Sequence, residues 1–210
     1  MHLIEPGTAD WHTARTGAWT ASRAPALMAR RALVAYRAGD EVYRTKTEAA
    51  KVLKITVPQY NKALKDEDSS AVGEVEVTEP LDEHTNLIGE IAVERLTGTP
   101  VSHFVTPAMR RGLELEPEAA DAYAVERMVA LGDSRFVFHP TIERVGATPD
   151  RFIGKDGLLE IKVPTVQSKH LGTLLRNKRS IEHEYEWQCH FQMWCTGRAW
   201  VDLVSYSPSF

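Results

Sequence analysis

The sequence predicts a mixed α/β fold in which a central β-sheet is flanked by helices. Three observations favour this class. Helical spacing of apolar residues dominates the first 131 residues, and short runs of β-forming residues take over after Gly132. A helix and a strand, at about 184–196 and 200–206, then complete the pattern. A chain of 210 residues is long enough to bury a core, and we expect a single domain over 1–210.

The N-terminal part is expected to be helical. Thr20 and Ser22 offer side-chain oxygens that could cap a helix over 20–38, in which Ala, Leu, Met and Val recur at helical spacing. Helical patterns return at about 82–97 and 107–131. These segments are expected to supply helices that cover the sheet.

Residues 40–80 are expected to form a helical insertion. Two short helices within 45–65 resemble a helix-turn-helix, although Lys54 stands where such turns usually have glycine. The unit could contact DNA or could be a plain helical insertion, and the sequence leaves both open. Residues 66–80 are acidic and contain two serines, a glycine and a proline, which predicts an exposed flexible loop.

The C-terminal half is expected to supply the sheet. Residues 154–157, Gly-Lys-Asp-Gly, form a good hairpin turn between the last two of its four short β-rich runs. These runs cover 136–138, 141–145, 148–153 and 158–163.

Composition excludes several classes of protein. No run of about 18 or more apolar residues occurs, so no membrane span is expected. The N-terminus lacks a basic segment followed by an apolar stretch, and two cysteines do not imply a disulfide framework, so we expect a cytoplasmic protein. The net charge of −4 does not favour a general DNA coat, but basic residues cluster locally at 30–31, 110–111 and 176–179.

The most informative residues are Asp150, Glu160 and Lys162. Successive side chains of a strand point to opposite faces, so Glu160 and Lys162 share one face and Ile161 points into the core. Asp150, at the start of the preceding strand, can lie beside Glu160. Carboxylate oxygens bind Mg²⁺, which activates water and neutralises charge on a phosphate, while an ammonium orients the water or stabilises the oxyanion. The alternative is a surface hairpin with a cross-strand salt bridge.

With Pro149, these three residues match the Pro-Asp…Glu-x-Lys motif of the PD-(D/E)xK nuclease superfamily. Further blocks resemble the lambda exonuclease (YqaJ-like) family of viral recombinases, and they occur in the same order. The blocks are 10–22, 112–119, 185–194 and 197–208. The resemblance implies a restriction-endonuclease-like core.

The resemblance also implies roles for individual residues. Lys162 and Gln188 would be catalytic beside Asp150 and Glu160, with Gln192 as a second candidate one turn after Gln188. The implied metal ligands are Glu116, Asp150, Glu160 and the main-chain carbonyl of Ile161. For Glu116 the alternative is a surface charge paired with Arg110 or Arg111.

Arg15 and Ser22 would bind a 5′-terminal phosphate in this family. A guanidinium matches phosphate geometry, and a hydroxyl near a helix start joins the free N–H groups there. The alternatives are a surface cation for Arg15 and an ordinary N-cap for Ser22 or Thr20.

The function expected from the resemblance is a DNA exonuclease that uses Mg²⁺ or Mn²⁺ and resects linear duplex ends, 5′ to 3′. The implied source is a phage or prophage, with a single-strand annealing protein as partner and a homotrimer as assembly. Two other interpretations stay open: an endonuclease of the same fold, and a DNA-binding protein without catalysis.

Overall fold

A computed structural model of the protein describes residues 3–66, 70–102, 104–175 and 183–209. The chain divides into a main unit, Met1–Met28 with Asn86–Phe210, and an inserted unit, Ala29–Thr85. The inserted unit therefore extends beyond the expected 40–80 at both ends. The expected basic cluster at 176–179 lies outside the described residues, as do residues 67–69 of the expected loop.

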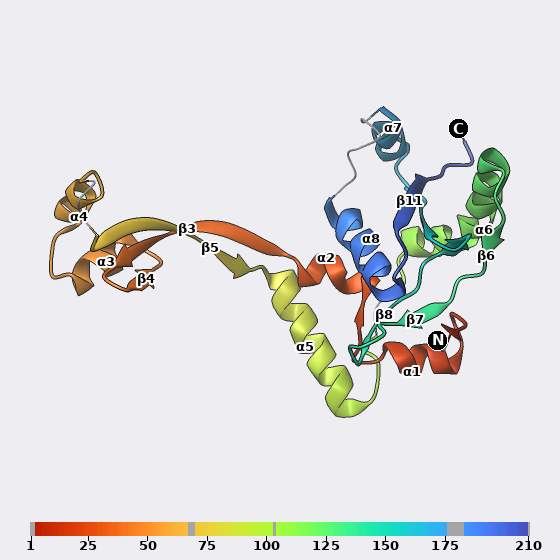
Figure 1. The fold of residues 1–210 in the computed structure, drawn as a ribbon, viewed down its shortest axis with the longest axis horizontal. Coiled ribbons are helices and arrows are strands. Elements are labelled where there is room, and N and C mark those ends of the chain that lie inside the picture. The colour runs from red at the N-terminus through yellow and green to blue at the C-terminus, as the bar shows by residue number, and fades with distance from the viewer. Residues whose placement is uncertain (1–2, 67–69, 103, 176–182, 210) are drawn as a thin grey trace. The chain divides into compact units, whose positions relative to one another are not determined.

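Two four-stranded sheets form the framework of the main unit (Figure 1). Their strands are β1 (Leu3–Ile4), β2 (Trp19–Thr20), β6 (Leu131–Gly132), β7 (Phe136–Phe138), β8 (Val145–Ala147), β9 (Arg151–Ile153), β10 (Gly157–Lys162) and β11 (Trp200–Ser205). One sheet has the order β1-β7-β8-β2 and the other the order β11-β10-β9-β6. The pairs β8–β2 and β10–β11 are parallel and the other neighbours antiparallel, so the sheets are mixed.

The main unit also contains helices. They are α1 (Ala9–Arg15), the 3₁₀ helix η1 (Ala21–Arg23), α2 (Ala24–Leu27), the main-unit part of α5 (Asp82–Thr97), α6 (Pro107–Arg127), α7 (Gln167–Leu175) and α8 (His183–Thr196). Of these, α6 packs on β10 and α8 on β7, β8 and β11. The principal core joins α6 to β10, because Ala119, Ala120 and Tyr123 pack with Leu159 and Ile161. In the part of the chain that the structure describes, no helix is long and apolar enough to cross a membrane.

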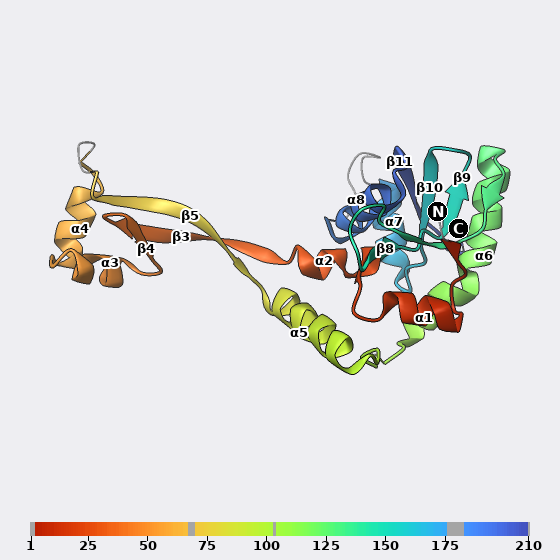
Figure 2. The ribbon, with the colours of Figure 1, turned by 60° about the horizontal axis from the view of Figure 1, so that its bottom comes forward.

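The inserted unit is an antiparallel sheet with two helices. Strands β3 (Arg30–Ala38), β4 (Glu41–Tyr43) and β5 (Val72–Pro80) have the order β4-β3-β5, and helices α3 (Lys46–Val52) and α4 (Val57–Ala63) lie at one end of the β3–β5 pair (Figure 2). Its core contains Ala38, Ala49, Ala50, Tyr60 and Val72.

The helix expected over 20–38 is wrong beyond its first turns. Helix α2 ends at Leu27, and β3 begins at Arg30. All nine residues of β3 pair with β5, from Arg30 opposite Pro80 to Ala38 opposite Val72. The helix propensity of the Ala- and Leu-rich segment is therefore overridden by a partner strand that lies far away in the sequence.

The flexible loop expected over 66–80 is also wrong, because β5 occupies most of it. Its alternation of valine with glutamate is the period of a strand, and the acidic composition concealed this signal. The strand expected over 141–145 begins only at Val145, since Arg144 has a φ of 55° in the preceding turn. The two helices expected within 45–65, and the final helix and strand, agree with the structure.

Two glycines of the main unit differ in how alanine should affect stability. A Cβ at Gly146 would lie 2.8 Å from the carbonyl oxygen of Val137, whereas one at Gly89, within α5, would meet nothing within 4 Å. We predict that Gly146→Ala lowers the free energy of unfolding by about 1–3 kcal/mol through overpacking. Gly89→Ala should raise it by about 0.5–1 kcal/mol by removing backbone entropy from the unfolded chain. Urea unfolding followed by circular dichroism measures both, and equal effects would contradict the packing described for Gly146.

Candidate active site

Strand β10 presents two kinds of side chain. Leu159 and Ile161 belong to the apolar core with α6. Glu160 and Lys162 point to the other face, where the Lys162 ammonium donates to Glu160 Oε1 at 2.6 Å. The alternation expected from the sequence is therefore present, and the strand separates a polar layer from an apolar one.

Glu160 is only 2% exposed, and three side chains donate hydrogen bonds to its carboxylate. Besides Lys162, the amides of Gln188 and Gln192 donate to Oε1 and Oε2 at 2.5 and 2.6 Å. Both glutamines lie on α8, one turn apart. Gln192 is fully buried, and its Oε1 has no hydrogen-bond partner among the described residues. The second glutamine candidate therefore contacts the central carboxylate as directly as the first.

Asp150 lies beside this pair, immediately before β9. Its Oδ2 accepts a hydrogen bond of 2.6 Å from the backbone N–H of Ile161, which places the carboxylate next to Glu160 across the hairpin. Burial raises the pKa of Asp150 well above its ordinary value, and the nearby charges of Glu160 and Glu116 raise it further. A site that disfavours a second negative charge in this way gains from a cation.

Lys162 stays protonated in this site. Burial lowers the pKa of its ammonium, but the charge of Glu160 and the hydrogen bond to it outweigh that effect, and the net pKa is raised. The ammonium also donates to Gln188 Oε1 at 3.0 Å and lies 4.9 Å from the ring centre of Tyr185. Lys162 is therefore an ammonium held in place by its hydrogen bonds to Glu160 and Gln188.

Glu116 faces the same region from α6, but an arginine holds it. Arg151 Nη1 donates to Glu116 Oε1 at 2.7 Å, so the alternative pairing with Arg110 or Arg111 is wrong. Arg151 was not predicted as a site residue, because its only signal in the sequence is its place next to Asp150. The ion pair uses the carboxylate that the resemblance assigns to metal.

The residue types at the site suit a hard cation, but their arrangement does not yet form a metal site. Asp150, Glu160 and Glu116 offer the oxygen ligands that Mg²⁺ prefers. Within the described ranges, however, no three side chains of His, Cys, Asp or Glu are grouped as a metal site would require. The donor chemistry fits, while Glu116 would have to exchange Arg151 for the metal.

Arg15 and Ser22 meet, as their predicted role requires. Arg15 Nη2 donates to Ser22 Oγ at 3.2 Å, and Ser22 Oγ lies 3.2 Å from Thr20 Oγ1. Thr20 precedes η1 without a side-chain capping bond, and its partner is Ser22 instead. Burial, with repulsion from Arg23, lowers the pKa of Arg15 to about 10. A desolvated guanidinium beside an exposed hydroxyl is suited to an anion.

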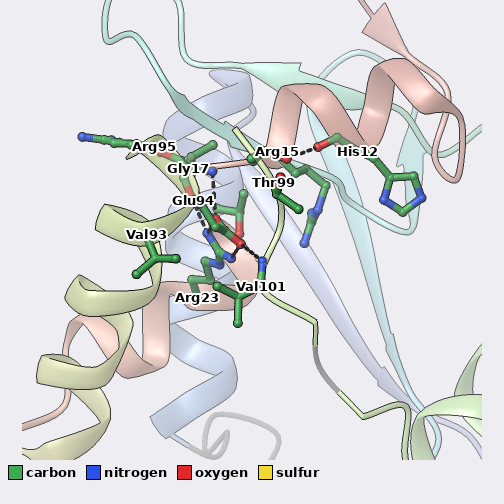
Figure 3. Close-up of polar contacts among 12 residues, drawn as sticks. His12, Arg15, Gly17, Arg23, Val93, Glu94, Arg95, Thr99 and Val101 are labelled. Atoms are coloured by element: carbon green, nitrogen blue, oxygen red, sulfur yellow. Dashed lines mark hydrogen bonds and ion pairs between the residues drawn. The ribbon is translucent and has the colours of Figure 1, made fainter. Parts of the chain in front are cut away.

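A buried carboxylate that was not predicted from the sequence stabilises this segment. Glu94, on α5 and 2% exposed, accepts two hydrogen bonds from the Arg23 guanidinium, at 2.8 and 2.9 Å (Figure 3). The backbone N–H groups of Gly17 and Val101 donate to it at 2.8 and 3.1 Å. Burial opposes its ionisation, but these donors dominate and lower its pKa to about 2. Glu94 thus ties down the segment between Arg15 and Ser22.

We predict that Glu94→Gln destabilises the main unit by about 3 kcal/mol or more, because Arg23 loses its buried partner. The pKa of Glu94 is lowered from 4.5 to about 2, so its contribution is complete above pH 4.5 and is lost as the pH falls toward 2. The free energy of unfolding in urea should therefore fall less steeply in Glu94→Gln than in the parent chain as the pH is lowered between these values. Glu126→Gln, at an exposed site on α6, is the control and should change stability by less than about 0.5 kcal/mol.

Comparisons with known proteins identify the family of the chain. Residues 10–199 match the model of the YqaJ-like viral recombinase domain, whereas no curated protein matches. Two crystal structures of the alkaline exonuclease LHK-Exo from Laribacter hongkongensis, one in complex with dAMP, are similar to the chain. Each is 29% identical, with a TM-score of 0.66 over 97% of this chain and 76% of that one. The restriction-endonuclease-like α/β class is confirmed, and the chain belongs to the YqaJ-like viral recombinase family.

Proposed function

We propose that the protein is a metal-dependent deoxyribonuclease that resects the ends of linear duplex DNA, 5′ to 3′. The observation that carries the proposal is the grouping of Asp150, Glu160 and Lys162 at one edge of the β9–β10 hairpin. Membership of the recombinase family and similarity to an alkaline exonuclease support a nuclease.

The proposed cofactor is Mg²⁺ or Mn²⁺. Asp150, Glu160 and the Ile161 carbonyl would hold it, with Glu116 once Arg151 releases that carboxylate. When bound, the cation supplies an activated water and neutralises charge on the phosphate. The raised pKa of Asp150 supports this proposal, because clustered carboxylates are a disadvantage to a protein that binds only phosphate.

The side chains around Glu160 would position the reaction. Lys162, held by Glu160 and Gln188, would orient the attacking water and stabilise the developing oxyanion. Gln188 contacts both Lys162 and Glu160, and would hold the ammonium toward the substrate. Gln192 keeps the second oxygen of Glu160 in place from the buried side.

Arg15 and Ser22 would bind the 5′-terminal phosphate and so determine polarity. The geometry that supports this is the hydrogen bond from the guanidinium of half-buried Arg15 to the exposed Ser22 hydroxyl. The family resemblance adds further proposals: a homotrimer around DNA, a single-strand annealing protein as partner, and a role in phage-type recombination. An endonuclease of the same fold is the second candidate, since the same three residues could cleave within a strand.

We predict that Lys162→Ala lowers the rate of cleavage of linear duplex DNA by about 100-fold or more, because one charged group that stabilises the transition state is lost. Release of nucleotides with Mg²⁺ and with chelator measures the effect. Lys155→Ala, in the exposed β9–β10 turn, is the matched control and should cleave at the parent rate. Cleavage of closed circular DNA would identify the endonuclease, and a parent chain that cleaves no substrate with Mg²⁺ or Mn²⁺ would leave a DNA-binding protein.

We predict that a 5′-phosphate accelerates digestion relative to a 5′-hydroxyl, and that Arg15→Gln abolishes this difference by removing the guanidinium fork. The ratio of the two rates in one preparation is the measurement, so that a partly unfolded variant does not imitate the result. A ratio that stays at the parent value in Arg15→Gln would remove Arg15 from the phosphate site.

A further inference from the structure

The helices of the inserted unit concentrate positive charge. Residues 44–65 contain six Lys or Arg and one Glu, a net charge of +5, whereas the whole chain carries −4. The glutamates of the same unit lie mainly on the strands, with three on β5. Asp66, Glu67 and Asp68 follow directly in the sequence, so the excess of positive charge is local to the two helices and the turn between them.

The two helices have the local geometry of a helix-turn-helix. Each begins with a complete capping box, Thr45 with Glu48 for α3 and Thr56 with Gln59 for α4. Four residues join them, and Lys54 adopts a φ of 57°, the left-handed conformation that glycine usually supplies at this turn. The helix ends are thus determined locally, without help from a bound partner.

Helix α4 has an inner and an outer face. Tyr60 is fully buried, and its hydroxyl donates to the Arg37 carbonyl at 2.5 Å, while Val57, Ala63 and Leu64 pack around it. Three exposed residues of α4 lie opposite Tyr60 at helical spacing, namely Pro58, Asn61 and Lys62, and Lys65, two residues beyond the helix end, continues the same spacing. Gln59 is exposed as well and belongs to the capping box. The outer face thus combines an amide with two ammonium groups and contributes nothing to the core.

Most of the basic side chains are not neutralised within the unit. Arg44 and Lys46 form salt bridges with Glu79 and Glu74 of β5. Four exposed lysines have no salt bridge to any described residue: Lys51, Lys54, Lys62 and Lys65. A second helix with an outward polar face and free cations is suited to the major groove and its phosphates.

We propose that the inserted unit is a second, independent site for duplex DNA, with the outer face of α4 entering the groove and the free lysines contacting phosphates. The inference goes beyond the proposed nuclease site and does not rest on it, because binding is measured without cleavage.

The test is binding of the full chain to a fluorescent blunt duplex in chelator, by anisotropy over a series of salt concentrations. We compare K51A/K62A/K65A with the charge-retaining variant K51R/K62R/K65R. The alanine variant should bind about tenfold or more weakly, and the slope of log K against log salt should fall by about 2–3, near 0.9 for each lost phosphate contact. The arginine variant should keep the affinity and slope of the parent.

An alanine variant that binds like the parent would overturn the proposal. So would an equal loss of affinity for single-stranded DNA of the same length, because that result describes a general polyanion surface. Urea unfolding of both variants verifies that they are folded. A chain that never cleaves DNA can still give the expected result, so failure of the nuclease proposal is distinguishable from failure of this one.

Discussion

A carboxylate inside a protein must be compensated, and the compensation of Glu160 organises the polar side of the main unit. Removing an ion from water costs several kcal/mol even after relaxation, on the order of what the whole fold can spare. Donors from β10 and α8 converge on both oxygens of Glu160. The same strand turns Leu159 and Ile161 toward α6. One alternating strand thereby joins an apolar core to a layer of charge.

The Arg15 region follows the same logic with the opposite sign. Arg23 and two backbone N–H groups donate hydrogen bonds to Glu94, so its negative charge is compensated within the fold. Arg15 donates a hydrogen bond to the Ser22 hydroxyl and lies 4.4 Å from the ring centre of Trp11, and it forms no salt bridge with any residue that the structure describes. The Arg23–Glu94 pair holds the segment in place. Arg15, which has no carboxylate partner of this kind, is the candidate to bind an anion.

In the inserted unit, the residues that form the core are distinct from the charged residues on the surface. Three alanines, one tyrosine and one valine form its buried core, and further apolar side chains pack against them, so the long polar side chains of the helices stay outside. Glu79 and Glu74 form salt bridges with Arg44 and Lys46, whereas the lysines farther along the helices form none with a described residue. The unit thus combines local helix signals with a surface that the core does not need.

The sequence by itself determined the features that depend on neighbours along the chain. These are the β9–β10 hairpin, the shared face of Glu160 and Lys162, and the two capped helices of 45–65, because alternation and capping act over a few residues. The tertiary structure alone decided the pairing of β3 with β5, the Arg151–Glu116 ion pair and the burial of Glu94. Each of these joins residues far apart in sequence. The local pattern of a helix-forming or acidic segment does not specify which distant residues it will contact.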